Sequence, residues 1–168
     1  LVAPYEFIVV LLENKVWDED YIRALYRQKL RFTANLPDEF RLLAAGESQL
    51  MLRGVDANGA PFAMEGAPIR AIGMKEGVVV GPVPAAAIVG GPHPNAARVF
   101  LNWLLSREGQ AVWGEAMANK MVRKDVPDFR PTAVQVPETT KSLLTTIEHL
   151  EKATELFKQK WFDKVVGR

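Results

Sequence analysis

Short apolar runs bounded by glycine and proline fill the middle of the chain, and they limit its fold more than any other feature. They cover residues 69–72, 77–80 and 85–89, and a further strand-like segment covers residues 49–55. Runs of this length between glycines and prolines are typical of buried β-strands. Because segments with helical spacing precede and follow them, the sequence predicts an α/β fold rather than one dominated by hairpins.

Polar residues mark the predicted helix boundaries. Asp18, Asn35 and Ser106 each precede a segment with helical spacing, and Pro37 lies just after the second of them. Such side chains accept a backbone N–H at a helix N-terminus, and proline is favoured in the first turn. Gly46 is placed to end a helix in the left-handed conformation. The stretch 56–59, Asp-Ala-Asn-Gly, predicts a turn after the strand-like segment.

Two amphipathic helices are predicted in the last half of the chain. The first has the helical face Ala96, Val99, Phe100, Trp103 and Leu104, which we expect to be buried. The second starts at about Glu138 and has the seam Leu143, Ile147, Leu150, Thr154, Phe157 and Trp161. This seam is expected to pack against the same domain or against a second copy. The chain then divides into an α/β region (1–122), an extended connector (123–137) and a C-terminal amphipathic helix (138–168).

Charge and composition exclude several classes of protein. Lys and Arg number 21 and Asp and Glu number 20, so the net charge of +1 leaves no basic footprint for nucleic acid. The absence of cysteine excludes disulfides, cysteine-ligated zinc and a thiol nucleophile. No run of 18 apolar residues and no signal peptide is present, and the chain opens at Leu1. We therefore expect a mature or truncated product that lacks its signal sequence.

The sequence also predicts a protein that is not an enzyme. Gly46 lies two positions before Ser48, as in a nucleophile elbow, but the second glycine of that motif is missing. Here a predicted helix also leads into a predicted strand, whereas an elbow needs the reverse order. The two histidines, His93 and His149, lie far apart without cysteine, so no zinc site is expected, and His149 is expected to be solvated. Neither a metal nor a cofactor is predicted.

A glycine-rich turn joins the last predicted strand to the helix after it. Its sequence, which includes Gly91 and His93, is Gly-Gly-Pro-His-Pro-Asn over residues 90–95. Backbone N–H groups in such a turn can point at an anion with help from the helix dipole. The turn matches neither the phosphate-loop pattern nor the dinucleotide fingerprint. The alternative is a tight turn in which His93 braces the helix start.

The segment 87–110 resembles the family 1 extracellular solute-binding proteins, most closely the subgroup that includes the ferric-iron binders of bacterial ABC importers. It reads AIVGGPHPNAARVFLNWLLSREGQ, with a Pro-His-Pro-Asn-Ala-Ala turn, then Leu-Leu-Ser and Glu-Gly-Gln. Upstream, residues 43–47 (Leu-Ala-Ala-Gly-Glu) resemble the family's Ala-Gly-Glu element. The resemblance covers roughly residues 18–118.

This resemblance implies a periplasmic or lipid-anchored bacterial receptor of the type II periplasmic-binding-protein fold. Two α/β lobes would close over a small solute and present it to an ABC permease in the membrane, without chemistry on the solute. Family members are about twice this length, so the chain is expected to be a C-terminal half that lacks the N-terminal lobe. The ferric binders carry adjacent tyrosines after the Ala-Gly-Glu strand, but residues 53–62 contain none, which argues against phenolate ligation of iron.

The loop after the 49–55 segment is then the predicted ligand contact. Arg53 is suited to a carboxylate or phosphate, and Asp56 and Asn58 are suited to polar donors; the alternative is that all three form a surface turn. A second function stays open, that of a protein-interaction or oligomerisation module. It would use the exposed lobe-facing surface and the C-terminal helix, and the partner would be a second copy of the chain.

Overall fold

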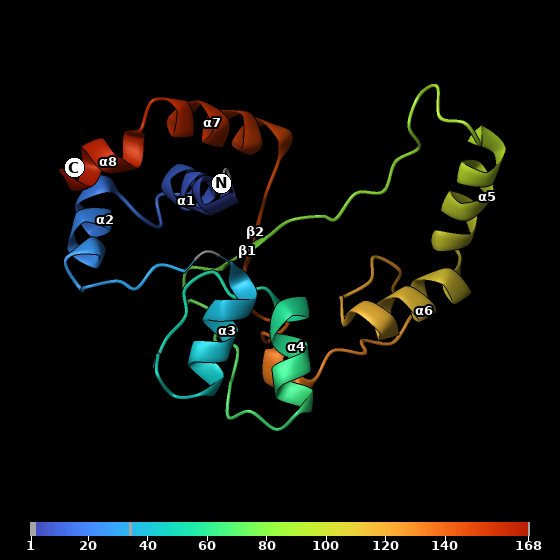
Figure 1. The fold of residues 1–168 in the computed structure, drawn as a ribbon, viewed down its shortest axis with the longest axis horizontal. Coiled ribbons are helices and arrows are strands. Elements are labelled where there is room, and N and C mark those ends of the chain that lie inside the picture. Colours follow the sequence, from blue (N-terminus) through green and yellow to red (C-terminus); the bar gives the residue numbers. More distant parts are fainter. Residues whose placement is uncertain (1–2, 34, 168) are drawn as a thin grey trace. The chain divides into compact units, whose positions relative to one another are not determined.

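A computed structural model of the chain describes residues 3–33 and 35–167. Its first half contains α1 (Ala3–Glu13), α2 (Glu19–Tyr26), α3 (Leu36–Ala44), α4 (Asp56–Met64) and β1 (Val78–Val80). Then follow α5 (Pro94–Leu104), α6 (Arg107–Met117), the 3₁₀-helix η1 (Thr132–Val134), β2 (Ser142–Leu144), α7 (Ile147–Lys158) and α8 (Trp161–Val166) (Figure 1). In the described part of the chain, no helix is long and apolar enough to cross a membrane.

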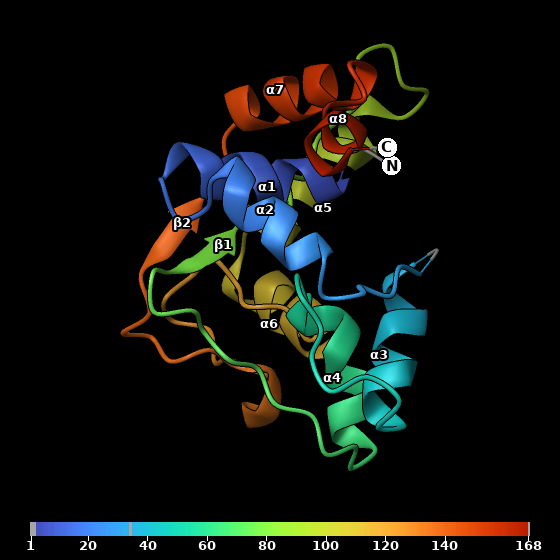
Figure 2. The same ribbon diagram turned by 90° about the vertical axis from the view of Figure 1, so that its left-hand side faces the viewer.

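The described strands form one small parallel sheet. β1 pairs with β2 in the register Val78 with Ser142, Val79 with Leu143 and Val80 with Leu144 (Figure 2). Parallel strands require a long crossover, and here the crossover carries α5 and α6. This helix-rich structure with parallel pairing is compatible with the predicted α/β class.

The chain divides into two compact units. Unit 1 contains Leu1–Phe32, Gly73–Pro82 and Pro137–Arg168, and unit 2 contains Thr33–Ile72 and Val83–Val136. Each unit is therefore assembled from segments that are distant in sequence. The division predicted from the sequence, at residues 122 and 137, stays a prediction.

Unit 1 is built around α1, which packs along α7. The apolar run of α1 supplies Val9, Val10 and Leu11, all at most 1% exposed. Further buried residues of this core come from the α1–α2 link, α2, β2 and α8, namely Trp17, Ile22, Leu143 and Val165. As predicted, Asp18 caps α2, and its Oδ1 accepts the N–H of Tyr21 at 2.7 Å. The cap satisfies one of the free donors of the first turn.

The core of unit 2 lies between α3, α4 and η1. Its buried residues are Phe40, Ala60, Ile69 and Val134. The predicted start of α3 is confirmed, because Asn35 Oδ1 accepts the N–H of Asp38 at 2.9 Å and Pro37 lies in the first turn. Ser106 likewise caps α6. Gly46 follows α3 with φ +74°, in the left-handed conformation predicted for it.

Most of the predicted strands are wrong. Only residues 78–80 of the four apolar runs form a strand; residues 49–55, 69–72 and 85–89 are irregular. A strand needs a neighbouring chain, and the backbone bonds between elements give residues 69–72 a single such bond, from Ala71 N to Ala133 O. Residues 85–89 are exposed, with Val89 99% accessible.

The turn predicted at residues 56–59 is also wrong, because these residues begin α4. Gly59 is buried in this helix, where a Cβ would lie 2.7 Å from Cε1 of Phe40. Glycine is therefore required by the close approach of the Phe40 ring rather than by a turn. Glycine disfavours a helix, so the packing against Phe40 rather than the local sequence determines that these residues are helical.

The predicted C-terminal helix begins later and is interrupted. Leu143 lies in β2, and α7 begins only at Ile147, where Thr146 and His149 form a capping box. The helix breaks at Lys160, whose φ of +51° is left-handed, and α8 follows. The predicted seam is thus divided. Leu143 is buried and Trp161 packs on the core of unit 1, whereas Ile147, Leu150 and Phe157 are exposed.

The face of α5 predicted to be buried is only partly covered in the described structure, since Trp103 and Leu104 are half-buried and the other three residues are exposed. The predicted helix is present and contains all five residues of this face, but none of its residues is buried, and Val99 is 69% accessible. The helix is amphipathic as predicted, but the described part of unit 2 supplies no surface that buries its apolar face.

Candidate functional site

The three predicted contact residues Arg53, Asp56 and Asn58 lie where the chain enters α4. Arg53 precedes the helix, Asp56 is its first residue and Asn58 lies in its first turn, and all three are half-buried. Arg53 has φ +63°, a left-handed conformation that costs a residue with a Cβ about 1 kcal/mol. Strained residues of this kind gather at ligand sites, so Arg53 stays a candidate contact.

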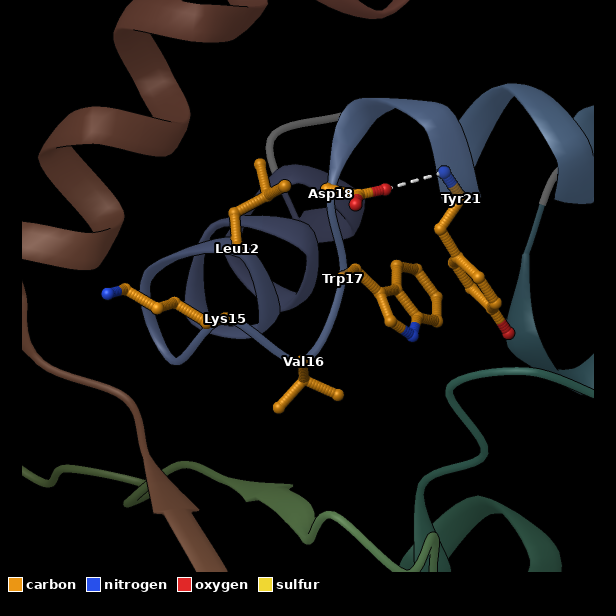
Figure 3. A pocket seen from close by; sticks show the side chains of 6 residues that line it. All are labelled: Leu12, Lys15, Val16, Trp17, Asp18 and Tyr21. Atoms are coloured by element: carbon orange, nitrogen blue, oxygen red, sulfur yellow. Dashed lines mark hydrogen bonds between the residues drawn. The ribbon is translucent and has the colours of Figure 1, made fainter.

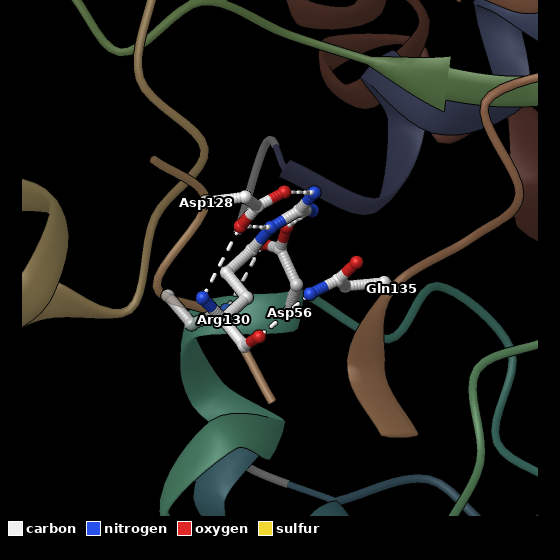
Figure 4. A network of polar contacts seen from close by, with 5 residues as sticks. Asp56, Asp128, Arg130 and Gln135 are labelled. Carbon is white, nitrogen blue, oxygen red and sulfur yellow. Dashed lines mark hydrogen bonds and ion pairs between the residues drawn. The ribbon is translucent and has the colours of Figure 1, made fainter. Parts of the chain in front are cut away.

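Asp56 is held by an arginine from a distant part of the chain. Nη1 of Arg130 lies 2.5 Å from Oδ2 of Asp56, while its Nη2 and Nε donate to the two carboxylate oxygens of Asp128 (Figure 4). The Arg130 side chain is only 11% exposed. This cluster ties the segment before η1 to the start of α4.

The pairing of Arg130 with Asp128 shifts the pKa values of both groups toward their charged forms. The hydrogen bond from Arg130 lowers the pKa of Asp128, although burial opposes this shift. The same bond with Asp128 raises the pKa of Arg130 above its ordinary value. The amide of Gln135 also donates to the backbone oxygen of Arg130 at 2.6 Å. The cluster fixes geometry and offers no free base or nucleophile.

The side chains of Arg53 and Asn58 are available to bind a ligand at this position. Within residues 3–33 and 35–167, neither side chain makes a hydrogen bond or an ion pair. A half-buried guanidinium without a carboxylate partner is suited to a carboxylate or phosphate of a ligand. Asp56, in contrast, already has its cation.

Gly91 and His93 lie at the start of α5, after the exposed segment 83–90. His93 occupies the N-cap position of α5, but its side chain makes no cap hydrogen bond, so it does not brace the helix through the side chain. Among the described residues, no hydrogen bond or ion pair connects this turn with Arg53, Asp56 or Asn58. The five predicted contacts therefore fall at two places in unit 2.

A depression in unit 1 was not predicted from the sequence. It has a volume of about 450 Å³ and is lined by Leu12, Lys15, Val16, Trp17, Asp18 and Tyr21 (Figure 3). The Trp17 ring lies between Phe7 and Tyr21, with centroid distances of 5.6 and 5.1 Å. Figure 3 shows Lys15 pointing away from the two labelled rings, and Asp18 capping α2. The lining of the depression combines two aromatic and two aliphatic side chains with one lysine and one aspartate.

The described residues also contain no group of three or more His, Asp or Glu side chains placed to hold a metal. Acid and histidine side chains instead form pairs between elements, such as Glu13 with His149.

A family model described as bacterial extracellular solute-binding protein matches residues 8–116 of the chain. The matched region runs from α1 to α6 and includes the 87–110 segment. No curated protein and no solved structure gives a significant match.

Proposed function

Because the chain belongs to the bacterial extracellular solute-binding proteins, we propose that it is the solute-binding component of an ABC-type importer. The family implies binding of a small solute outside the cytoplasm, in the periplasm or the extracellular space. In the proposed mechanism, lobe closure traps the solute for a membrane permease and no bond of the solute is changed.

The observation that carries the proposal is the extent of the family match, which covers more than half of the chain. We further infer that the chain is the C-terminal half of a two-lobed type II receptor and derives from family 1, near the ferric-iron binders. The sequence over residues 87–110 supports this subgroup. Iron itself is not the proposed solute, because the three tyrosines all lie within residues 5–26.

The proposed solute contacts are Arg53 and Asn58 near α4, and Gly91 and His93 at the start of α5. Arg53 would hold an anionic group of the solute, since its guanidinium has no partner among the described residues. Asp56 would act mainly by position, because Arg130 already neutralises it. A solute with a carboxylate or phosphate group is the expected class.

A panel of small anionic and neutral solutes tests this proposal by thermal shift of the purified protein. Ligand binding to the folded state raises the melting temperature by mass action. We expect an anionic solute to stabilise the protein and the Arg53→Ala variant to lose this effect. Arg98→Ala, which removes an exposed cation on α5, is the matched control. A shift that persists in Arg53→Ala would remove Arg53 from the site.

A second candidate function, an oligomerisation module, rests on the exposed apolar residues. Ile147 is 71% accessible on α7, and Val99 and Phe100 are exposed on α5. Uncovered apolar surface of this kind is typical of interaction sites. Light scattering after gel filtration would show a stable oligomer that dissociates in the Ile147→Ser variant. A monomer at all concentrations would contradict this alternative.

A further inference from the structure

Two cationic stretches from opposite ends of the chain meet in unit 1. Residues 23–31 contain no acid and four cations, Arg23, Arg27, Lys29 and Arg31. Residues 158–164 contain three lysines, Lys158, Lys160 and Lys164, and one acid. The two stretches are brought together because α2 packs against α8 (Figure 1). In a chain with a net charge of only +1, this is a local concentration of positive charge.

A depression of about 360 Å³ lies between these two helices, and we call it the α2–α8 pocket. Three cations line it, namely Arg23, Arg27 and Lys164, together with Tyr26 and the last turn of α8. The lining contains no carboxylate. The Tyr26 ring packs edge-on against Phe162, with centroids 6.0 Å apart, and so forms a fixed aromatic wall.

Arg23 has a structural task in this pocket. Its two terminal nitrogens pair with Glu19 and Asp20 at 2.9 and 2.6 Å. Its Nε donates to the backbone oxygen of Val165 at 3.0 Å. The residue thereby joins α2 to the end of α8, and its charge is already neutralised.

Arg27 and Lys164, in contrast to Arg23, do not join the two helices through ion pairs or hydrogen bonds among the described residues. In the described part of the chain, neither side chain makes an ion pair or a hydrogen bond. Arg27 is the C-cap residue of α2 and Lys164 lies in the last turn of α8, so both are attracted by helix carbonyls. A helix C-terminus carries only about half a negative charge, so it neutralises the positive charge of Arg27 or Lys164 only in part.

We propose that the α2–α8 pocket binds a phosphate group. Arg27 and Lys164 line the same depression from two different helices. A planar guanidinium and an ammonium together offer several hydrogen-bond donors, which suits the several acceptor oxygens of phosphate. The group could belong to a free phosphate ion or to the headgroup of an anionic lipid. This site lies in unit 1 and is independent of the solute contacts proposed in unit 2.

The test is a titration of the intact protein with inorganic phosphate, followed by amide chemical shifts at constant ionic strength. Arg27→Gln and Lys164→Gln each remove one pocket cation, and Lys75→Gln removes an exposed cation of the same unit outside the pocket. For exposed charges, we expect phosphate affinity to fall about threefold or more in each pocket variant. Lys75→Gln should bind as the parent does, and Lys164→Arg should retain binding.

A second arm identifies the source of the phosphate. Vesicles of phosphatidylcholine with phosphatidylglycerol are compared with vesicles of phosphatidylcholine alone. Binding to the anionic vesicles that depends on Arg27 and Lys164 assigns the pocket to a lipid headgroup, whereas binding of inorganic phosphate alone assigns it to the free ion. The proposal is overturned if neither probe binds, or if Lys75→Gln weakens binding as much as the pocket variants do. Circular dichroism of each variant confirms that it is folded.

Discussion

Nε2 of His149 lies 2.9 Å from Oε2 of Glu13, and this contact fastens α7 to α1. The other ring nitrogen, Nδ1, accepts the backbone N–H of Thr146 at 2.9 Å. One neutral imidazole serves both bonds when its proton is on Nε2. The expectation that His149 is solvated is therefore wrong, since its side chain is only 12% exposed.

Protonation of the Glu13 carboxylate should lower the free energy of unfolding in acid. The hydrogen bond from Lys152 lowers the pKa of Glu13 below the ordinary value of 4.5, and the charge of Lys152 and the hydrogen bond from His149 act in the same direction. A lowered folded-state pKa contributes stability above pH 4.5, and this contribution disappears as the pH falls through the folded-state pKa. Urea unfolding across this range should show a shallower acid dependence for Glu13→Gln. An unchanged slope would contradict the assignment.

Thr146 should contribute to stability as the cap of α7. Its hydroxyl oxygen accepts the N–H of His149, and its own N–H donates to that ring. Loss of an N-cap side chain typically costs about 1 kcal/mol, so Thr146→Ala should lower the free energy of unfolding by about that amount. Thr139→Ala, in an exposed turn, is the control. Equal stability of the two variants would show that the capping box is dispensable.

Arg130 should be the most sensitive charged residue of unit 2. Its removal leaves Asp56 and Asp128 facing the same space without their shared cation. Breaking such a largely buried pair should cost about 1–3 kcal/mol, measured by denaturant unfolding of Arg130→Gln. The additional change Asp128→Asn should recover part of this loss, because it removes one of the two unpaired charges. If Arg130→Gln costs no more than Arg98→Gln, the cluster does not hold α4.

Gly59 tests the packing of α4 against α3. An added Cβ would lie 2.7 Å from the Phe40 ring, which is itself buried. The clash should outweigh the gain of about 1 kcal/mol in helix propensity, so Gly59→Ala should lose about 1–2 kcal/mol of stability. Phe40→Leu in the same chain should relieve the clash. Additive effects of the two changes would contradict direct contact.

The features that could be predicted from sequence are those that depend on neighbouring residues. Asp18, Asn35 and Ser106 cap helices through bonds to residues three positions away, so the local pattern contains the whole interaction. The resemblance over residues 18–118 is confirmed for the bacterial extracellular solute-binding proteins as a class by the match to residues 8–116, whereas family 1 and its subgroup stay a prediction.

Long-range relationships could not be predicted in this way. β1 and β2 pair across 64 positions, so an apolar run in the sequence cannot show whether it will find a partner. The Asp56–Arg130 pair spans 74 positions, so the residues around Asp56 in the sequence give no sign that its carboxylate has an arginine partner.

Replacing Arg53 by glycine should affect the stability of the protein and its binding of the solute differently. Glycine adopts a positive φ without the Cβ penalty, so Arg53→Gly should be as stable as the parent or up to about 1 kcal/mol more stable. The same change removes the guanidinium proposed to hold the solute. Unfolding and solute binding measured on one preparation should therefore move in opposite directions. A variant that is destabilised and still binds would contradict both statements.

Native mass spectrometry of the purified protein, run gently enough to keep bound ligands, tests the central claim most directly. Solute binding predicts a protein carrying a small-molecule adduct of defined mass, and the loss of that adduct in Arg53→Ala. A ligand-free dimer or larger species would contradict it and would favour the oligomerisation module instead.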